Sequence, residues 1–210
     1  MPYGYTGQNT PNQLVRNTGF FSINDAYNLT QQGYLGGSYE LIASQTLGAT
    51  AFSEVTFRNL PTETYDVFKI VSKMDAGDGT NGGGIGLQFY ENDVLESANV
   101  YNRTIYIVYD TGSTFDNRST AQANPAVLAQ STSTGKGSSA TCYVYNAGNP
   151  NSYTYTSWQV GSEINNGQWR GHKGSGNLPQ ASKVDGFRCY SNASDIGNCT
   201  IAIYGMKDIT

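Results

Sequence analysis

The chain has 210 residues, enough for one sizeable domain, and only 13% of them are charged, about half the usual share for a soluble domain. Glycine (25 residues) and tyrosine (16 residues) are abundant, and an aromatic fraction of 12% argues against a disordered chain. The formal net charge of −4, with lysines and arginines scattered singly, disfavours nucleic-acid binding. No apolar run reaches the roughly 18–20 residues that cross a bilayer, so no membrane insertion is predicted.

The first 37 residues differ in pattern from the rest of the chain. Residues 1–17 are polar and show no sustained helical or strand period, which predicts an extended arm that takes its order from a neighbouring molecule. One short helix is predicted to follow, capped by Ser22 or Asn24 and ended by the glycines at 33–37. The candidate anchoring residues of this arm are Tyr3, Tyr5, Leu14, Phe20 and Phe21.

From Ser38 onward the hydrophobic period changes to two, which predicts strands joined by polar turns. The clearest strand covers residues 65–74, where alternate residues from Tyr65 to Val71 share one face and the opposite face is also partly apolar, as in the centre of a sheet. The other predicted strands cover residues 39–43, 51–57, 85–90, 99–109, 140–146, 153–160, 184–190 and 199–206.

A long segment at 110–139 consists mainly of serine, threonine, glycine and asparagine, with one short apolar patch at 126–129. We interpret it as an exposed loop, since a segment this polar is a poor component of a core. The succession of strands, with no helical stretch after residue 37, predicts an all-β chain. Residues 38–210 are expected to form a single β-sandwich with jelly-roll-like topology, and residues 1–37 the N-terminal anchoring arm.

Groups that could support catalysis or bind a metal are few. His172, the single histidine, lies in the Gly-His-Lys-Gly sequence 171–174, which we interpret as a surface turn rather than a base held beside a nucleophile. The segment 75–81 has oxygen-bearing side chains but lacks the alternating ligands and closing glutamate of a calcium loop. No pattern places the paired carboxylates of a glycosidase. We therefore predict no catalytic residue, no metal and no cofactor.

The three cysteines, Cys142, Cys189 and Cys199, have no metal-type spacing. Cys142 and Cys199 lie in strand-like segments, so we interpret the cysteines as small buried hydrophobic residues. A structural disulfide between two of the three is the alternative interpretation.

Four aromatic residues stand close together in the second half of the chain. Tyr153 and Tyr155 share one face of a predicted strand, which favours packing, whereas Trp158 and Trp169 flank the segment 161–167, which favours exposure. Aromatic rings fill cores and interfaces, and they also stack on the apolar faces of sugars. We interpret the group first as core or subunit interface, and glycan or host contact by Trp158, Trp169 and Tyr155 is the alternative.

Several segments, taken together in their order and spacing, resemble small virion structural proteins of marine tailed bacteriophages, including cyanophages. The resemblance is carried by GFFSIND at 19–25, GGSYELI at 36–42, VTFRNL at 55–60, YDVFKI at 65–70 and TIAIYGMK at 200–207. It implies a non-enzymatic protein of the virion surface, which serves as a tail fibre, an appendage or a head decoration. No catalytic residue comes with it.

The resemblance also implies partners. The arm would join the chain to other virion proteins of the capsid or tail while the β-sandwich projects outward, and the chain would form a homo-oligomer, with a trimer as the first expectation. The first residues lack the basic and apolar regions of a secretory signal, so we expect synthesis in the host cytoplasm without secretion.

Two alternatives from other classes stay open. One is a carbohydrate-binding host adhesin, which can itself be a virion component and would contact a host surface glycan. The other is a polysaccharide depolymerase, which the missing catalytic pattern disfavours.

Overall fold

The computed structural model describes residues 39–48, 53–74, 84–130, 137–164, 168–191 and 199–206. The predicted arm at 1–37, with its short helix and its anchoring residues Tyr3, Tyr5, Leu14, Phe20 and Phe21, lies outside the described residues. The segment 75–81, which was considered for calcium, also lies outside them.

The described part of the chain is all-β, as the alternating pattern predicts. Its thirteen strands are β1 (Glu40–Leu47), β2 (Glu54–Phe57), β3 (Val67–Met74), β4 (Gly84–Glu91), β5 (Val94–Leu95), β6 (Tyr101–Tyr109), β7 (Thr114–Gln122), β8 (Val127–Gln130), β9 (Ser138–Tyr145), β10 (Tyr153–Ile164), β11 (Gln168–Ala181), β12 (Val184–Ser191) and β13 (Cys199–Met206). Within these residues, no helix is long and apolar enough to span a membrane.

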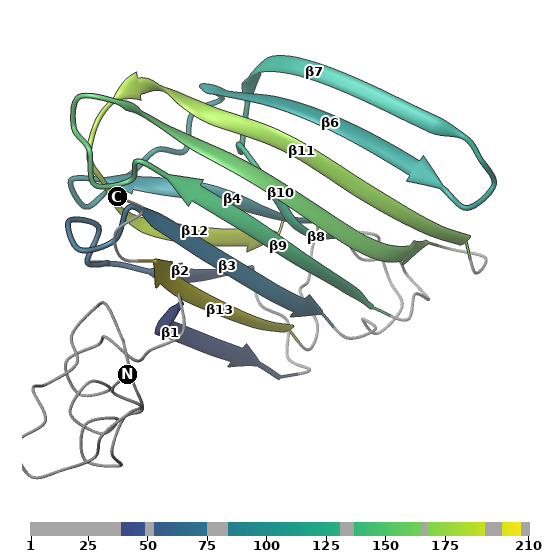
Figure 1. The fold of residues 1–210 in the computed structure, drawn as a ribbon, viewed down its shortest axis with the longest axis horizontal. Helices are drawn as coiled ribbons and strands as arrows, with labels where there is room; N and C mark the ends of the chain where they lie inside the picture. The colour runs from purple at the N-terminus through teal and green to yellow at the C-terminus, as the bar shows by residue number, and fades with distance from the viewer. Residues whose placement is uncertain are drawn as a thin grey trace, which may run out of the picture. The chain divides into compact units, whose positions relative to one another are not determined.

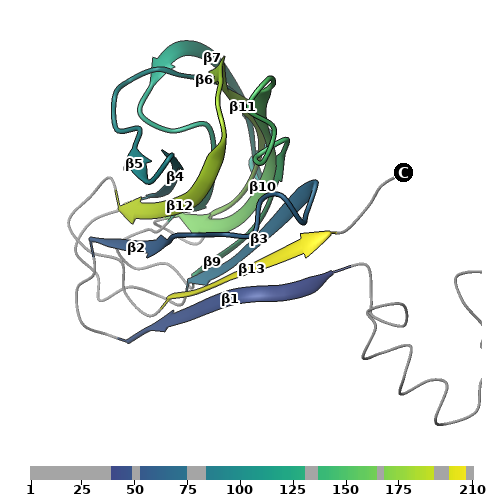
Figure 2. The same cartoon turned by 90° about the vertical axis from the view of Figure 1, so that its left-hand side faces the viewer.

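The strands form two antiparallel sheets stacked as a sandwich (Figures 1 and 2). The larger sheet has eight strands in the order β1-β13-β3-β9-β10-β11-β6-β7, and the smaller has five, with β2-β12-β4-β5 in order and β8 beside β4. The chain passes alternately between the sheets from β1 to β4 and again from β11 to β13, which is the crossing pattern of a jelly roll. The predicted β-sandwich is confirmed.

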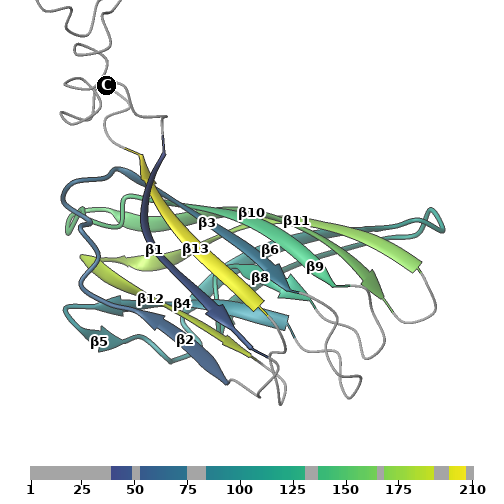
Figure 3. The same cartoon turned by 90° about the horizontal axis from the view of Figure 1, so that it is seen from below.

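The smaller sheet covers only part of the larger one. Strands β6, β7, β10 and β11 extend beyond it, as the views in Figures 1 and 3 agree in showing. The core lies where the sheets overlap. There the ring of Phe187 from β12 meets Phe68 of β3 edge-on at a centroid distance of 5.5 Å, and lies 5.9 Å from Phe89 of β4. These fully buried rings join the two sheets through favourable aromatic geometry.

Strand β11 corrects the predicted surface turn at 171–174. Two glycines of this strand serve close packing rather than a turn: a Cβ on Gly174 would lie 2.3 Å from the carbonyl oxygen of Thr104, and one on Gly176 would lie 2.1 Å from that of Pro125. Glycine in a strand often marks such a close approach of another backbone.

The prediction of an exposed loop at 110–139 is wrong for two of its parts. The patch at 126–129 enters the core, where Ala126, Leu128 and Ala129 are fully buried, and β8 pairs with β4. Strand β7 exposes nearly all of its side chains because it is the edge strand of the larger sheet, hydrogen-bonded to β6 alone. An edge strand with a polar sequence has the composition of a loop.

The cysteines are buried and free, which confirms their interpretation as small core residues. Burial raises the pKa of the thiols of Cys142 and Cys189, so both are held in the unreactive thiol form.

Candidate functional site

The candidate site lies on the face of the larger sheet that points away from the core. Side chains alternate between the two faces along each strand, and β10 shows this clearly. Trp158 and Val160 are buried between the sheets, whereas Ser157 and Gln159 point outward. Pairing with β9 and β11 carries the same alternation to the neighbouring strands.

The strand register places outward side chains side by side in rows that cross the sheet. From β3 to β7, the first row is Lys69, Tyr143, Ser157, Ser175, Thr104 and Arg118. The second row is Val71, Thr141, Gln159, Lys173, Tyr106 and Asp116. These residues come from distant parts of the sequence, and only the sheet brings them together.

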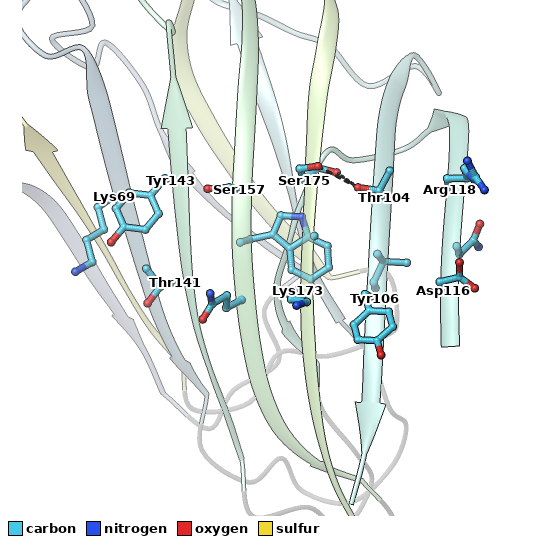
Figure 4. A pocket seen from close by; sticks show the side chains of 15 residues that line it. Lys69, Thr104, Tyr106, Asp116, Arg118, Thr141, Tyr143, Ser157, Lys173 and Ser175 are labelled. Carbon is cyan, nitrogen blue, oxygen red and sulfur yellow. Dashed lines mark hydrogen bonds between the residues drawn. The ribbon is translucent and has the colours of Figure 1, made fainter. Parts of the chain in front are cut away.

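A groove of about 810 Å³ opens over these two rows (Figure 4). A second hollow of about 610 Å³ shares Tyr106, Thr141, Gln159 and Lys173 with it and continues toward the end of β10 and the start of β11. There the floor is formed by Gly161 and Gly171, which face each other in register. A Cβ on either glycine would have no atom within 4 Å, so small residues keep the groove open.

Two tyrosines stand on opposite sides of the groove, Tyr143 on β9 and Tyr106 on β6 (Figure 4). A lysine accompanies each ring: Lys69 Nζ lies 6.0 Å from the ring centroid of Tyr143, and Lys173 Nζ lies 5.4 Å from that of Tyr106. Both distances fall within the range of cation–π attraction. The groove therefore has aromatic walls with a cation beside each of them.

Further tyrosines continue the aromatic wall along the outer face. Tyr145 stacks on Tyr143 with ring centroids 6.4 Å apart, and Tyr153 lies 6.5 Å from Tyr155. Tyr155 is paired in register with Tyr145, so these residues form one patch across β9 and β10. The hydroxyl groups of Tyr145 and Ser157 are 3.4 Å apart, which links the patch to the groove floor.

The groove also carries polar groups that are available to a ligand. The hydroxyls of Thr104 and Ser175 are 3.0 Å apart, and each keeps acceptor capacity for a further partner. Within the described residues, the side chains of Arg118 and Asp116 take part in no ion pair, and both line the groove. Hydroxyl, amide and charged groups thus lie between the two aromatic walls.

The aromatic residues singled out from the sequence separate in the structure. Trp158 is 2% exposed and lies under Gly174, whose missing Cβ makes room for the indole ring, so its predicted exposure is wrong. Trp169 is 58% exposed, as predicted, and Tyr155 is 45% exposed although packing was the first interpretation. Trp169 is paired in register with Glu163, at the end of the outer face and outside the groove lining.

His172 corrects a second sequence interpretation. It lies inside β11, only 3% exposed, paired in register with Val160 and Ile107 on the inner side. Burial, and to a smaller extent the charge of Arg170, lower the pKa of His172 to about 4. Neither ring nitrogen has a hydrogen-bond partner among the described residues. A neutral imidazole in this position is a core residue.

Sequence reasoning missed most of the groove. The alternation of Tyr143 and Tyr145 with buried Cys142 and Val144 was a usable signal, since it marks an outward aromatic pair. The polar sequence of β7, which includes Arg118, predicts a loop and carries no such signal. In the described part of the chain, no three histidine, cysteine or acidic residues gather as metal ligands.

No protein-family model matches the sequence, and no curated protein is similar to it. Among solved structures, the chain is similar to one described as a bifunctional GH43-CE from Bacteroides eggerthii, with 13% identity over 82% of this chain and a TM-score of 0.33. The chain spans 21% of the length of that protein. A likeness of this TM-score carries no functional inference, so the outer face itself is the basis for assigning a function.

Proposed function

We propose that the protein is a non-enzymatic carbohydrate-binding β-sandwich that holds a glycan chain on the outer face of its larger sheet. The observation that carries the proposal is the open groove of about 810 Å³, walled by Tyr143 and Tyr106 and floored by small polar side chains. Ligand sites combine apolar surfaces with a few placed polar groups in this way.

The chemistry of a sugar fits these walls and this floor. Each pyranose ring has apolar C–H surfaces that stack on aromatic rings, and hydroxyl groups that need both donors and acceptors. Ser157, Ser175 and Gln159 offer both kinds of group. Because all of these side chains stand on paired strands, little ordering is required on binding. An open groove also suits internal residues of a polysaccharide better than a single terminal sugar.

The groove supports binding rather than hydrolysis. A glycosidase of the common type uses two carboxyl groups on either side of the scissile bond. Among the described residues that line the groove and the adjoining hollow, Asp116 is the one carboxylate. We therefore expect no release of reducing ends from a bound polysaccharide, and measured release would favour the depolymerase alternative.

Alanine variants of the walls test the proposal. We expect Tyr143→Ala and Tyr106→Ala each to weaken polysaccharide binding about tenfold, because each removes one stacking surface. Phe115→Ala is the matched control: Phe115 is 49% exposed, but its register with Ile107 places it on the opposite face of the sheet. Isothermal titration against a panel of polysaccharides measures the effect. Failure to bind any of them, or an equal loss with Phe115→Ala, contradicts the proposal.

The resemblance to phage structural proteins supplies the proposed setting. In it the chain is a virion component, a head decoration or a tail fibre or appendage, displayed as a homotrimer with residues 1–37 docked on capsid or tail proteins. The glycan-binding face would then serve host attachment. Immunogold labelling or cryo-electron microscopy of intact particles tests the location, and light scattering tests the trimer.

Deleting residues 1–37 tests the anchor. We expect a folded β-sandwich that still binds glycan but no longer joins the particle. A truncated protein that is insoluble, or one that still assembles, would show that the arm is not the anchor.

A further inference from the structure

This inference rests on the proposed function and narrows its ligand. We propose that the groove binds an anionic polysaccharide, one that carries uronate carboxylates or sulfate esters along its chain. The basis is the sign, the placement and the pairing of the charges in the groove.

The groove is positively charged on a negatively charged protein. Its charged lining consists of Lys69, Lys173, Arg118 and Asp116, which leaves an excess of two positive charges. The whole chain has a formal net charge of −4. Cations gathered in a hollow raise the local potential and attract anions to that place.

The cations are spread across the whole width of the groove. Lys69 stands on β3 and Arg118 on β7, at opposite ends of the first row, while Lys173 lies between them in the second row (Figure 4). A small anion would need its cations at one point. Cations distributed over several strands fit a repeating ligand that presents one negative group per sugar or per disaccharide.

Ring and cation are positioned to contact the same sugar residue. Lys173 Nζ lies over the ring of Tyr106, 5.4 Å from its centroid, so the ring and the amine border the same part of the groove. A sugar stacked on that tyrosine can therefore direct its carboxylate or sulfate to the lysine, as a charge-assisted hydrogen bond. Tyr143 with Lys69 repeats the arrangement on the other wall.

Three cations outside the groove form ion pairs, whereas Arg118 and Lys173 in the groove form none among the described residues. Outside the groove, ion pairs join Arg58 to Asp93, Lys183 to Glu63 and Arg188 to Glu54. Within the described residues, neither Arg118 nor Lys173 takes part in an ion pair. Arg118 and Lys173 thus keep their charges for a ligand in the groove.

The test uses the full chain and pairs of polysaccharides that share a backbone and differ in charge. One pair is a sulfated galactan and its desulfated form, and the other is a uronan and its carboxyl-reduced form. We expect the charged member of at least one pair to bind about tenfold more tightly, with an affinity that falls as salt is added. The pair that shows the preference distinguishes sulfate from carboxylate.

Charge-removing variants locate the effect. We expect Lys173→Gln and Arg118→Gln each to weaken binding of the charged polysaccharide about tenfold while binding of its neutral counterpart changes little. The control is Lys183→Gln, which makes the same change in net charge at an ion pair away from the groove. Circular dichroism confirms that each variant is folded.

The outcomes separate the two proposals. Equal affinity for the charged and neutral members of both pairs overturns the anionic ligand and leaves glycan binding in place. No binding to any polysaccharide overturns both. A loss with Lys183→Gln as large as that with Lys173→Gln assigns the preference to overall charge and overturns the role of the groove.

Discussion

The two faces of the larger sheet are made by the same strands and carry opposite chemistry. On β10, the inner side presents Trp158 to the core, and the outer side presents Gln159 to the groove. On β11, Gly174 faces inward, against Thr104 and Trp158, and the preceding residue, Lys173, faces outward into the groove. Because successive side chains of a strand point to opposite faces, one strand supplies both core residues and groove residues.

The difference predicts that the stability of this protein and its proposed ligand binding can be changed separately. Inner side chains that lie where the two sheets overlap are buried, so changing them alters the free energy of unfolding. Outer side chains stay in water, so changing them alters the surface offered to a ligand and leaves the core intact. The following predictions test this separation, from the largest expected effect on stability to the smallest.

Phe187→Ala is expected to have the largest effect. The ring is fully buried and contacts Phe68 and Phe89, so its removal leaves a cavity where the sheets meet and costs about 4 kcal/mol. Urea unfolding followed by tryptophan fluorescence measures the loss. A loss below about 1 kcal/mol, the level of a conservative core swap, would show that this contact does not hold the sheets together.

Gly174→Ala and Gly171→Ala compare the two faces directly on one strand. At Gly174 a Cβ would overlap the Thr104 carbonyl oxygen and the Trp158 ring, whereas at Gly171 it would meet no atom within 4 Å. We expect a loss of about 3 kcal/mol for the first and a change within about 0.5 kcal/mol for the second. The same urea titration measures both, and equal losses would contradict the separation of the faces.

His172→Leu tests the inner face through its pH dependence. Because the folded-state pKa of His172 is lowered from 6.5 to about 4, the unfolded chain takes up this proton first as the pH falls. The stability linked to His172 is therefore complete above pH 6.5 and is lost between pH 6.5 and about 4. His172 is the single histidine, which isolates its contribution.

We expect His172→Leu to lose less stability than the parent chain over this interval, by about 2 kcal/mol. At neutral pH we expect it to be as stable or slightly more stable, since it removes a buried polar ring without partners among the described residues. Urea midpoints at a series of pH values measure both effects. Parallel pH profiles for the two proteins would disprove the buried neutral state.

Tyr143→Ala is expected to have the smallest effect on stability. The ring lies on the outer face beside Tyr145, so its loss should change the unfolding free energy by about 0.5 kcal/mol, in contrast to the roughly tenfold loss of glycan affinity expected under the proposed function. Thermal unfolding of the variant and the parent measures the difference. A large loss of stability would show that the outer aromatic patch belongs to the structure rather than to a binding surface.

The fold was predictable wherever strands alternate regularly. The last strand was predicted at 199–206 and lies at Cys199–Met206, and the strand predicted at 65–74 lies at Val67–Met74. Prediction failed at β11, where inward glycines make room for a neighbouring backbone and a tryptophan ring. It also failed at β7, because the polar sequence of this exposed edge strand resembles that of a loop. In both strands the reason for the residues lies in their tertiary neighbours.

The candidate site was predictable only in fragments. Trp169 and Tyr155, two of the candidate contact residues, are exposed. Trp158, the third candidate, lies an odd number of residues from Tyr155 along β10 and therefore points to the opposite face of the sheet. This alternation along the strand was a usable signal in the sequence, and it places the indole ring of Trp158 in the core. Lys173, assigned to a surface turn with His172, proves to be a groove residue.

The sequence by itself determined the all-β class, most of the strands and the buried state of the cysteines, because hydrophobic alternation with a period of two is a local property. The tertiary structure decided which strands are neighbours, and therefore which outward side chains share a row. Tyr143 and Tyr106 stand 37 positions apart in the chain and border one groove only because β10 and β11 pair between β9 and β6. Strand pairing over such separations depends on the whole sandwich, so the groove exists only once the sheet has formed.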